Sequence, residues 1–313
     1  MGPFDEVIGG MHVESSLYAQ FKLRAPWGVR FSTGAQARLV VVAQGTCWLR
    51  WGGSKVPLVV QSGGCLIIQP GIAFDLSDAK RRSVIACETL LPAHDGCIVD
   101  YGGDGELTEL VAARFSFDPV AAEPLVAHMP PLAHVPLDPA HAELLQATLA
   151  LLGKETAQDG LGAGLVVDRL TDALFVQAMR ALLSNGCAFA PGWVLGLTDK
   201  RIARVIRAVH TDLARPWTVA DMAREAGVSR SSFAAAFRSA VGEPPLDYVT
   251  NWRIYRAKVL LTSSDESLAE IASRVGYDSD TALSRAFKRK VGVPPGEFRK
   301  ARTRTEATPT HQV

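Results

Sequence analysis

The chain has 313 residues, 48% of them hydrophobic, which is enough for two domains with a core each. It holds no uninterrupted apolar run of about 18 residues that could span a membrane. No signal segment is recognised at its start, and its five cysteines form no CxxC pair. A cytoplasmic location is therefore expected. The net charge of +1 is unevenly distributed along the chain. Residues 199–304 hold 20 Lys and Arg against 12 Asp and Glu (+8), while the remainder holds 13 against 20 (−7). The basic part therefore requires, or at least tolerates, a polyanionic partner.

Short β-prone runs separated by turn residues fill the segment from Phe21 to Leu91. The runs are WGVRFS, ARLVVVAQG, TCWLRWGG, PLVVQSGG, CLIIQPG and SVIACETLL. Regular short strands with glycine turns are typical of a β-barrel or a β-sandwich. The first part of the chain, residues 1–130, is therefore predicted to be a β-domain.

The interior of such a domain would be apolar with a few polar groups at its edge, which suits a small-molecule site. The candidate effector-binding residues are Arg38, Val40, Val42, Trp48, Phe74 and Leu76. The same side chains could equally form a packed core, because small barrels are often filled by their own residues. Both interpretations stay open at this point.

Two amphipathic helices are expected in residues 131–185, over Ala140–Leu152 and Gly164–Leu183. The second carries a stripe of apolar residues at helical spacing: Leu170, Leu174, Ala178 and Leu182. Residues 186–198 follow as a predicted linker, since Asn185-Gly186 lies at its start and Pro191-Gly192 within it.

The basic part contains an internal sequence repeat of two copies. GEPPLDY near Gly242 and GVPPGEF near Gly292 each follow a similar stretch, TVADMAREAGVSRSSFAAAFRSAV in the first copy and SLAEIASRVGYDSDTALSRAFKRKV in the second. Gly227 matches Gly276 at a separation of 49 residues, and the Pro-Pro pairs match at 50, which requires one inserted residue in the second turn. The repeat is thus a structural unit.

Each copy is predicted to fold as a helix, a glycine turn and a second helix. Thr218 with Asp221, and Ser267 with Glu270, have the spacing of a hydroxyl helix cap paired with an acid three residues later. The turn glycine comes next, and the Pro-Pro pair then ends the second helix. The second helices bury residues four positions apart: Phe233 and Phe237 in the first copy, Leu283 and Phe287 in the second. This is the helix-turn-helix pattern.

A further amphipathic helix is expected between the copies, from Leu246 to Leu261. Its buried stripe would be Tyr248, Trp252, Tyr255 and Val259. Such a helix would act as a strut between two recognition helices.

These features make the chain from about residue 199 to 302 resemble the DNA-binding domain of the AraC/XylS family of bacterial transcription regulators. The resemblance implies that two recognition helices bind successive major-groove segments of double-stranded DNA. It also implies a homodimer and contacts with RNA polymerase. The alternative is an unrelated all-α domain whose basic residues are merely solvated.

The predicted DNA-binding residues follow from the faces opposite the buried side chains. They are Arg230, Ser231, Ser232 and Arg238 in the first copy, and Asp280, Thr281, Ser284, Arg285 and Lys288 in the second. Arg285 is the best candidate for a bidentate contact to guanine, whereas Lys288 is expected to hold phosphate. The first copy departs from the family pattern, because it has Ala234, Ala235 and Ala236 where long polar side chains are usual; helix propensity explains this run equally well.

The β-rich segment resembles the cupin-type sensory domain that precedes many AraC-family DNA-binding domains, through CWLR, the GG and PG turns and RFSFD at Arg114–Asp118. In that family, helices after the barrel form a dimer contact; the alternative is that they only cover the barrel. Metal-binding cupins carry histidines on these strands, but this chain has none between His12 and His94, and Val40 stands in the place of one. No metal site and no cofactor are expected.

The sequence thus predicts an α+β multidomain protein: a cupin-like β-barrel (1–130), a helical dimerisation segment (131–185), a linker (186–198), an all-α double helix-turn-helix domain (199–304) and a disordered tail (305–313). It is predicted to be a non-enzymatic transcription regulator, more readily an activator, under control of a small-molecule effector. Two alternatives are a metal-dependent cupin enzyme fused to a DNA-binding domain and an architectural DNA binder without an effector. Cys87 and Cys97 bracket a turn and are either a redox pair or ordinary buried thiols.

Overall fold

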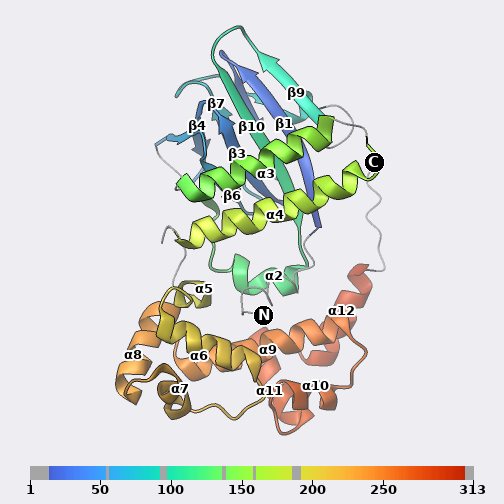
Figure 1. Cartoon of the computed structure of the whole chain (residues 1–313). Coiled ribbons are helices and arrows are strands. Elements are labelled where there is room, and N and C mark those ends of the chain that lie inside the picture. The colour runs from blue at the N-terminus through green and yellow to red at the C-terminus, as the bar shows by residue number, and fades with distance from the viewer. Residues whose placement is uncertain are drawn as a thin grey trace. The chain divides into compact units, whose positions relative to one another are not determined.

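A computed structural model describes residues 14–53, 56–91, 97–135, 139–157, 160–184 and 192–306 (Figure 1). By contacts these residues divide into two compact units. The sheet unit comprises the described residues within Val13–Phe117 and Met129–Phe189, and the helical unit those within Asp118–His128 and Ala190–Val313. Within this described part of the chain, no helix has both the length and the apolar character needed to cross a membrane.

The described strands of the sheet unit form two sheets. One has six strands in the order β11 (Leu132–Val135), β6 (Cys65–Ile68), β3 (Ala37–Gln44), β10 (Leu107–Ser116), β1 (Glu14–Arg24) and β9 (Cys97–Gly102). The other has five, in the order β5 (Leu58–Gln61), β4 (Thr46–Trp51), β7 (Phe74–Ser77), β2 (Gly28–Phe31) and β8 (Ile85–Ala86), and a short 3₁₀ helix, Cys87–Thr89, follows it. The prediction of short strands is confirmed, but these strands form two sheets and closure into a single barrel is not seen among them.

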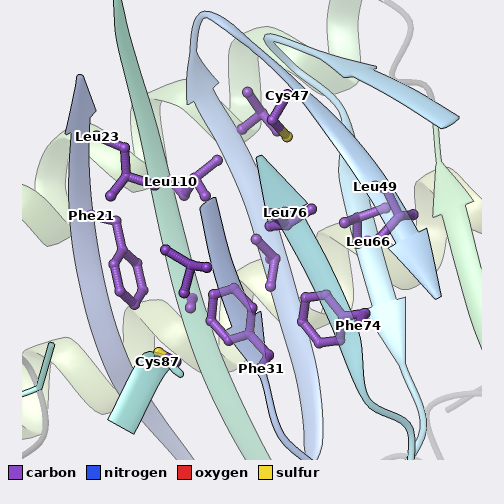
Figure 2. Packing of buried hydrophobic residues seen from close by; sticks show 14 of the residues in the cluster. Phe21, Leu23, Phe31, Cys47, Leu49, Leu66, Phe74, Leu76, Cys87 and Leu110 are labelled. Carbon is purple, nitrogen blue, oxygen red and sulfur yellow. The ribbon is translucent and has the colours of Figure 1, made fainter. Parts of the chain in front are cut away.

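Apolar side chains from both sheets share one core (Figure 2). Phe31 of β2 stacks on Phe74 of β7 with ring centroids 4.7 Å apart, and Phe21 of β1 meets the edge of Phe31 at 5.8 Å. Each aromatic ring is at most 2% exposed. Alternation along the strands directs every second side chain into this core, so the sheets are held face to face by apolar burial.

Helices α3 (Pro139–Ala157) and α4 (Ala163–Ser184) confirm the two helices predicted here, and they pack against each other along the sheet unit (Figure 1). The amide Nε2 of Gln177 on α4 donates to the hydroxyl of Thr148 on α3 at 3.0 Å. Phe175 of α4 packs on Phe115 of β10, with ring centroids 4.7 Å apart. Leu174 is completely buried. Most of the stripe therefore packs against the six-stranded sheet, which is the alternative to a dimer contact at these residues.

The helical unit contains α5 (Trp193–Gly196), α6 (Lys200–Thr211), α7 (Val219–Ala226), α8 (Arg230–Val241), α9 (Pro245–Ser263), α10 (Leu268–Arg274), α11 (Asp280–Val291) and α12 (Pro295–Glu306). Both predicted capping boxes are present, at the starts of α7 and α10. The turns that follow use Gly227 at φ 71° and Gly276 at φ 82°, a left-handed conformation that favours glycine. Two helix-turn-helix motifs, α7–α8 and α10–α11, result.

Helix α9 connects the two motifs, as predicted, and its 19 residues span about 28 Å. Its aromatic stripe is buried: Trp252 meets the edge of Trp193 at 5.4 Å and of Tyr255 at 4.9 Å between ring centroids. Tyr248 Oη and His210 Nε2 lie 2.8 Å apart, which joins α9 to α6.

Two boundaries differ from the sequence-based expectation. Helix α2 (Pro119–Val126) lies within the predicted β-domain, yet by its contacts it belongs to the helical unit. Trp193 and Val194, expected in the linker, are buried in α5 of the same unit. The rest of the linker, residues 186–191, falls outside the described residues, and so does the tail beyond Glu306.

Candidate nucleic-acid interface

The second helix of each motif is fixed by two fully buried side chains one turn apart. Phe233 and Phe237 anchor α8, and Leu283 and Phe287 anchor α11; all four are 0% exposed. Phe287 also contacts Phe298 of α12, edge to face, at 5.4 Å between ring centroids. Because side chains on a helix repeat every 3.6 residues, these anchors determine which residues of α8 and α11 face solvent.

On α11 the exposed face carries the predicted residues. Asp280, Thr281, Arg285 and Lys288 are exposed, and Ser284 is half-buried. The Asp280 carboxylate accepts from the backbone N–H of Thr281 at 2.6 Å and from its hydroxyl at 3.2 Å. Arg285 thus stands in the middle of an exposed helical face, with a local hydrogen-bond network one turn before it.

The corresponding face of α8 carries shorter side chains in its middle. Arg230, Ser231, Ser232 and Arg238 are exposed, as predicted. The hydroxyl of Ser229 donates to Ser232 Oγ at 2.9 Å and accepts from the Ser232 backbone N–H at 3.3 Å, so Ser232 takes part in capping the helix. Between Ser232 and Arg238 this face carries only Ala234, Ala235 and Ala236, whose methyl groups can contact thymine methyls but cannot donate hydrogen bonds.

Arg253 on α9 was missed by the sequence analysis. Its guanidinium donates to the carbonyl oxygens of Leu213 and Arg215, at 3.1 and 2.7 Å. Periodicity identified only the apolar side of α9, and no sequence signal marks a long-range contact of this kind. Arg299 on α12 has a similar role, because it donates to the carbonyl oxygen of Glu266 at 2.7 Å.

The candidate effector residues of the sheet unit lie mainly in the packed core. Val40, Val42, Phe74 and Leu76 are at most 1% exposed and belong to the cluster of Figure 2. Trp48 does not face this core, contrary to the expectation, because Cys47 and Leu49 on either side of it point inward and strand residues alternate. The remaining candidate, Arg38, donates through Nη1 to the carbonyl oxygen of Ser32 at 2.5 Å.

A charged cluster lies on the outer side of the five-stranded sheet, where Arg30 and Arg50 both bond to Asp75. The shortest distance is 2.8 Å in each pair. Burial raises the pKa of Asp75, but the hydrogen bonds from the two arginines outweigh burial and lower the pKa overall. These side chains hold β2, β4 and β7 together.

A cavity of about 440 Å³ is present in the helical unit, beside α2. Its walls include Trp193, Tyr255 and Lys258, together with Glu243. Burial raises the pKa of Glu243. The side-chain amide of Asn251 donates to Glu243 Oε2 at 2.5 Å, which offsets only part of this rise. A space of this size, with aromatic walls and a few polar groups, suits a small organic molecule.

Metal and thiol chemistry have little support in the described residues. No group of three His, Cys, Asp or Glu side chains among them is arranged to hold a metal ion. Burial raises the pKa of Cys47 to about 12 and also raises that of Cys65, so neither thiol ionises at neutral pH. Cys87 is buried, and the side chain of Cys97 lies outside the described residues.

Two helix-turn-helix motifs with exposed polar recognition faces, joined to a double-sheet unit, define the class: a DNA-binding transcription regulator. Comparisons with known proteins agree with this geometry. A cupin family matches residues 2–184 and a helix-turn-helix domain family matches residues 222–301. The chain belongs to the AraC-like transcription regulators with an N-terminal cupin domain, and relatives that match it along nearly their whole length are named as transcription regulators.

Several relatives match almost end to end. A putative AraC-like transcription regulator of Streptomyces lividans is 36% identical over 301 residues, covering 96% of this chain and 98% of the relative. The HTH-type transcriptional regulator MtrA of Neisseria gonorrhoeae is 30% identical over 305 residues, with coverages of 96% and 98%. Among solved structures, the DNA-binding domain of AdpA in complex with a target DNA is 33% identical and covers 35% of this chain and all of its own, with a TM-score of 0.34.

Proposed function

We propose that this regulator activates transcription by placing α8 and α11 in successive major-groove segments of its operator, as a homodimer that contacts RNA polymerase and responds to a small-molecule effector. The observation that supports it best is the exposed face of α11, where Arg285 and Lys288 project from a helix anchored by fully buried Leu283 and Phe287. The balance of +8 over residues 199–304 favours phosphate contacts around this face.

The experiment that tests this function is a binding-site selection with the full chain, followed by a transcription reporter that carries the selected site. We expect a site in which each chain binds two separated half-sites, one through α8 and one through α11. We also expect a rise in reporter transcription when the chain is present. A single short half-site would contradict two-helix binding, and repression from every placement of the site would contradict activation. Uniform binding to all sequences would favour an architectural DNA binder.

The proposed dimer surface is the outer side of α3. Leu144 and Leu151 lie seven residues apart, hence on one face, and are 51% and 52% exposed. Leu165 and Val166 at the start of α4 are exposed as well. A second copy of this chain would remove these side chains from water, which is favourable in proportion to the apolar area buried.

Helix α2 supports control of DNA binding by the N-terminal domain. In the chain it lies between β10 and β11, two strands of the six-stranded sheet, yet it is anchored on α9. The hydroxyl of Tyr255 donates to the carbonyl oxygen of Ala121 at 2.9 Å, and Lys258 pairs with Glu123 at 2.7 Å. The indole N–H of Trp193 donates to Pro124 O at 2.9 Å. A rearrangement of β10 or β11 that displaces either end of α2 would thus also displace α9 or break its contacts with α2.

The cavity beside α2 supports an effector site more readily than the packed core of the sheet unit. The walls also include Glu123 and Pro124 of α2, so an occupant that contacts them together with Trp193 would bind best when α2 is in place. A ligand shifts an equilibrium by its difference in affinity for the two states. We propose an aromatic or apolar small molecule with one polar group as this effector.

Removal of one hydroxyl group tests the role of α2. Tyr255→Phe is expected to weaken the anchoring of α2 by about 0.5–1.5 kcal/mol, because one buried hydrogen bond is lost. Hydrogen exchange at the amides of Ala121 and Ala122 should accelerate, and reporter output should change. Tyr248→Phe is the matched control. It removes a hydroxyl group from the same helix, but this hydroxyl contacts His210 on α6 and not α2. Faster exchange without any change in reporter output would show that α2 does not transmit regulation.

A further inference from the structure

The guanidinium of Arg253 binds the loop that leads into the first helix-turn-helix motif. Besides its bonds to Leu213 and Arg215, Nη2 lies 3.4 Å from the carbonyl oxygen of Ala214. These three consecutive residues connect α6 to α7. One side chain of the connecting helix therefore fixes the backbone of this loop at three points.

The same guanidinium also contacts the turn of the second motif. Its Cζ lies 5.8 Å from the centroid of the Tyr277 ring, a cation–π geometry. Next to it, Gly276 packs directly against the first motif's loop: a Cβ at this glycine would lie 2.6 Å from Ala214 O and 2.8 Å from Arg253 Nη2. The entry loop of one motif and the turn of the other thus touch, with Arg253 between them.

Charge and burial make this contact costly to break. Burial lowers the pKa of Arg253, while Tyr277 and Asp278 raise it, and an arginine side chain stays protonated in proteins. A charged group that is partly removed from water depends on its hydrogen-bond acceptors, and here these are backbone carbonyl oxygens. Rotation of one motif against the other would remove them.

The first motif has no equivalent contact at its own turn. Gly227 adopts the same left-handed conformation as Gly276, but a Cβ there would meet no atom within 4 Å. The two glycines therefore share the turn requirement and differ in packing. Only Gly276 lies at a junction between the motifs.

We propose that Arg253 and Gly276 form a positioning junction that sets the permitted spacing between the two half-sites on DNA. One added base pair moves a half-site by about 3.4 Å and rotates it by about 34° around the helix axis. Two recognition helices held by a stiff junction cannot follow that change, whereas two loosely joined motifs can. This inference rests on the proposed reading of DNA by both α8 and α11.

The test measures the affinity of the purified full chain for the selected operator and for versions with one base pair inserted or deleted between the half-sites. Wild-type protein should bind the altered spacings much more weakly than the selected one. Arg253→Met keeps most of the aliphatic stem but no donor, and it should bring these affinities closer together. Arg253→Lys should fall between the two, because an ammonium group cannot reach all three carbonyl oxygens with a planar fork.

Gly276→Ala and Gly227→Ala form the matched pair. Both place a side chain at a left-handed position, so both should lower the melting temperature, but only Gly276→Ala should relax the spacing preference. This pair tests the junction even where Arg253→Met fails to fold. Equal weakening at every spacing in Gly276→Ala and Arg253→Lys would overturn the junction while leaving two-helix binding intact. A wild-type chain without any spacing preference would overturn the two-helix reading itself, and the junction with it.

Discussion

Arg285→Ala is expected to weaken binding to the preferred DNA site by about 1–3 kcal/mol, which is roughly 5- to 150-fold, and to relax the preference at one base pair. Arg285 is exposed in the middle of α11, whose opposite side is held by Leu283 and Phe287. A guanidinium in that position can donate two parallel hydrogen bonds to guanine O6 and N7. Alanine preserves the helix and removes both.

Lys288→Ala is the matched control for Arg285→Ala, one turn further along the same exposed face. Its ammonium group is expected to contact phosphate, so its loss should weaken binding to all sequences alike and reduce the salt-dependence slope by about one. Binding-site selection at fixed salt, with wild type and both variants, separates the two roles. An unchanged base preference in Arg285→Ala would remove this residue from base recognition.

The two copies of the motif are not expected to contribute equally. Sequence discrimination should come mainly from the half-site bound by α11, because the exposed side of α8 presents alanine in the middle of the helix, at residues 234–236. Equal information in both half-sites would show that α8 reads bases through Arg230 or Ser231 more strongly than its side chains suggest.

Much of the helical unit could be predicted because its signals are local. A hydroxyl cap with an acid three residues later, a glycine in the following turn and aromatic residues one turn apart each specify their own part of the backbone. Both capping boxes and the turn at Gly276 are observed as predicted. The recognition face of α11 followed from the same periodicity.

The position of α2 could not be predicted, because it depends on contacts between residues more than 130 positions apart. Ala121 receives its hydrogen bond from Tyr255, and Glu123 its ion pair from Lys258. Nothing in the local sequence of α2 indicates that it belongs to the helical unit. Arg253 was missed for the same reason, since its acceptors lie about 40 residues earlier in the chain.

The sequence of the β-rich segment does not determine which face of each strand points toward the core. A run such as TCWLRW can place either its odd or its even residues toward the core, and a shift of one residue reverses every side chain. The structure places Cys47 and Leu49 in the core and Trp48 on the other side. Helix α4 posed a similar problem: a stripe of leucines predicts a buried face, but whether a sheet or a second chain buries it depends on tertiary packing.

Leu144→Glu combined with Leu151→Glu is expected to convert a dimer into a folded monomer. Both side chains are about half exposed on one face of α3, so two carboxylates there remain hydrated in the monomer but would be buried without partners in the proposed dimer. Sedimentation of wild type and variant at micromolar concentration measures the change, and the variant should also bind a two-site operator more weakly.

Leu174→Glu should behave differently, and the contrast distinguishes the dimer surface from the core. Leu174 is 0% exposed, so this variant loses packing worth about 2–5 kcal/mol and in addition buries a charge without a partner. We expect the sheet unit to unfold, with loss of its cooperative thermal transition, whereas the double variant on α3 keeps the wild-type transition of that unit. A folded, monomeric Leu174→Glu protein would show that α4, and not α3, forms the dimer contact. A wild-type chain that sediments as a monomer with and without DNA would contradict a dimer through either helix.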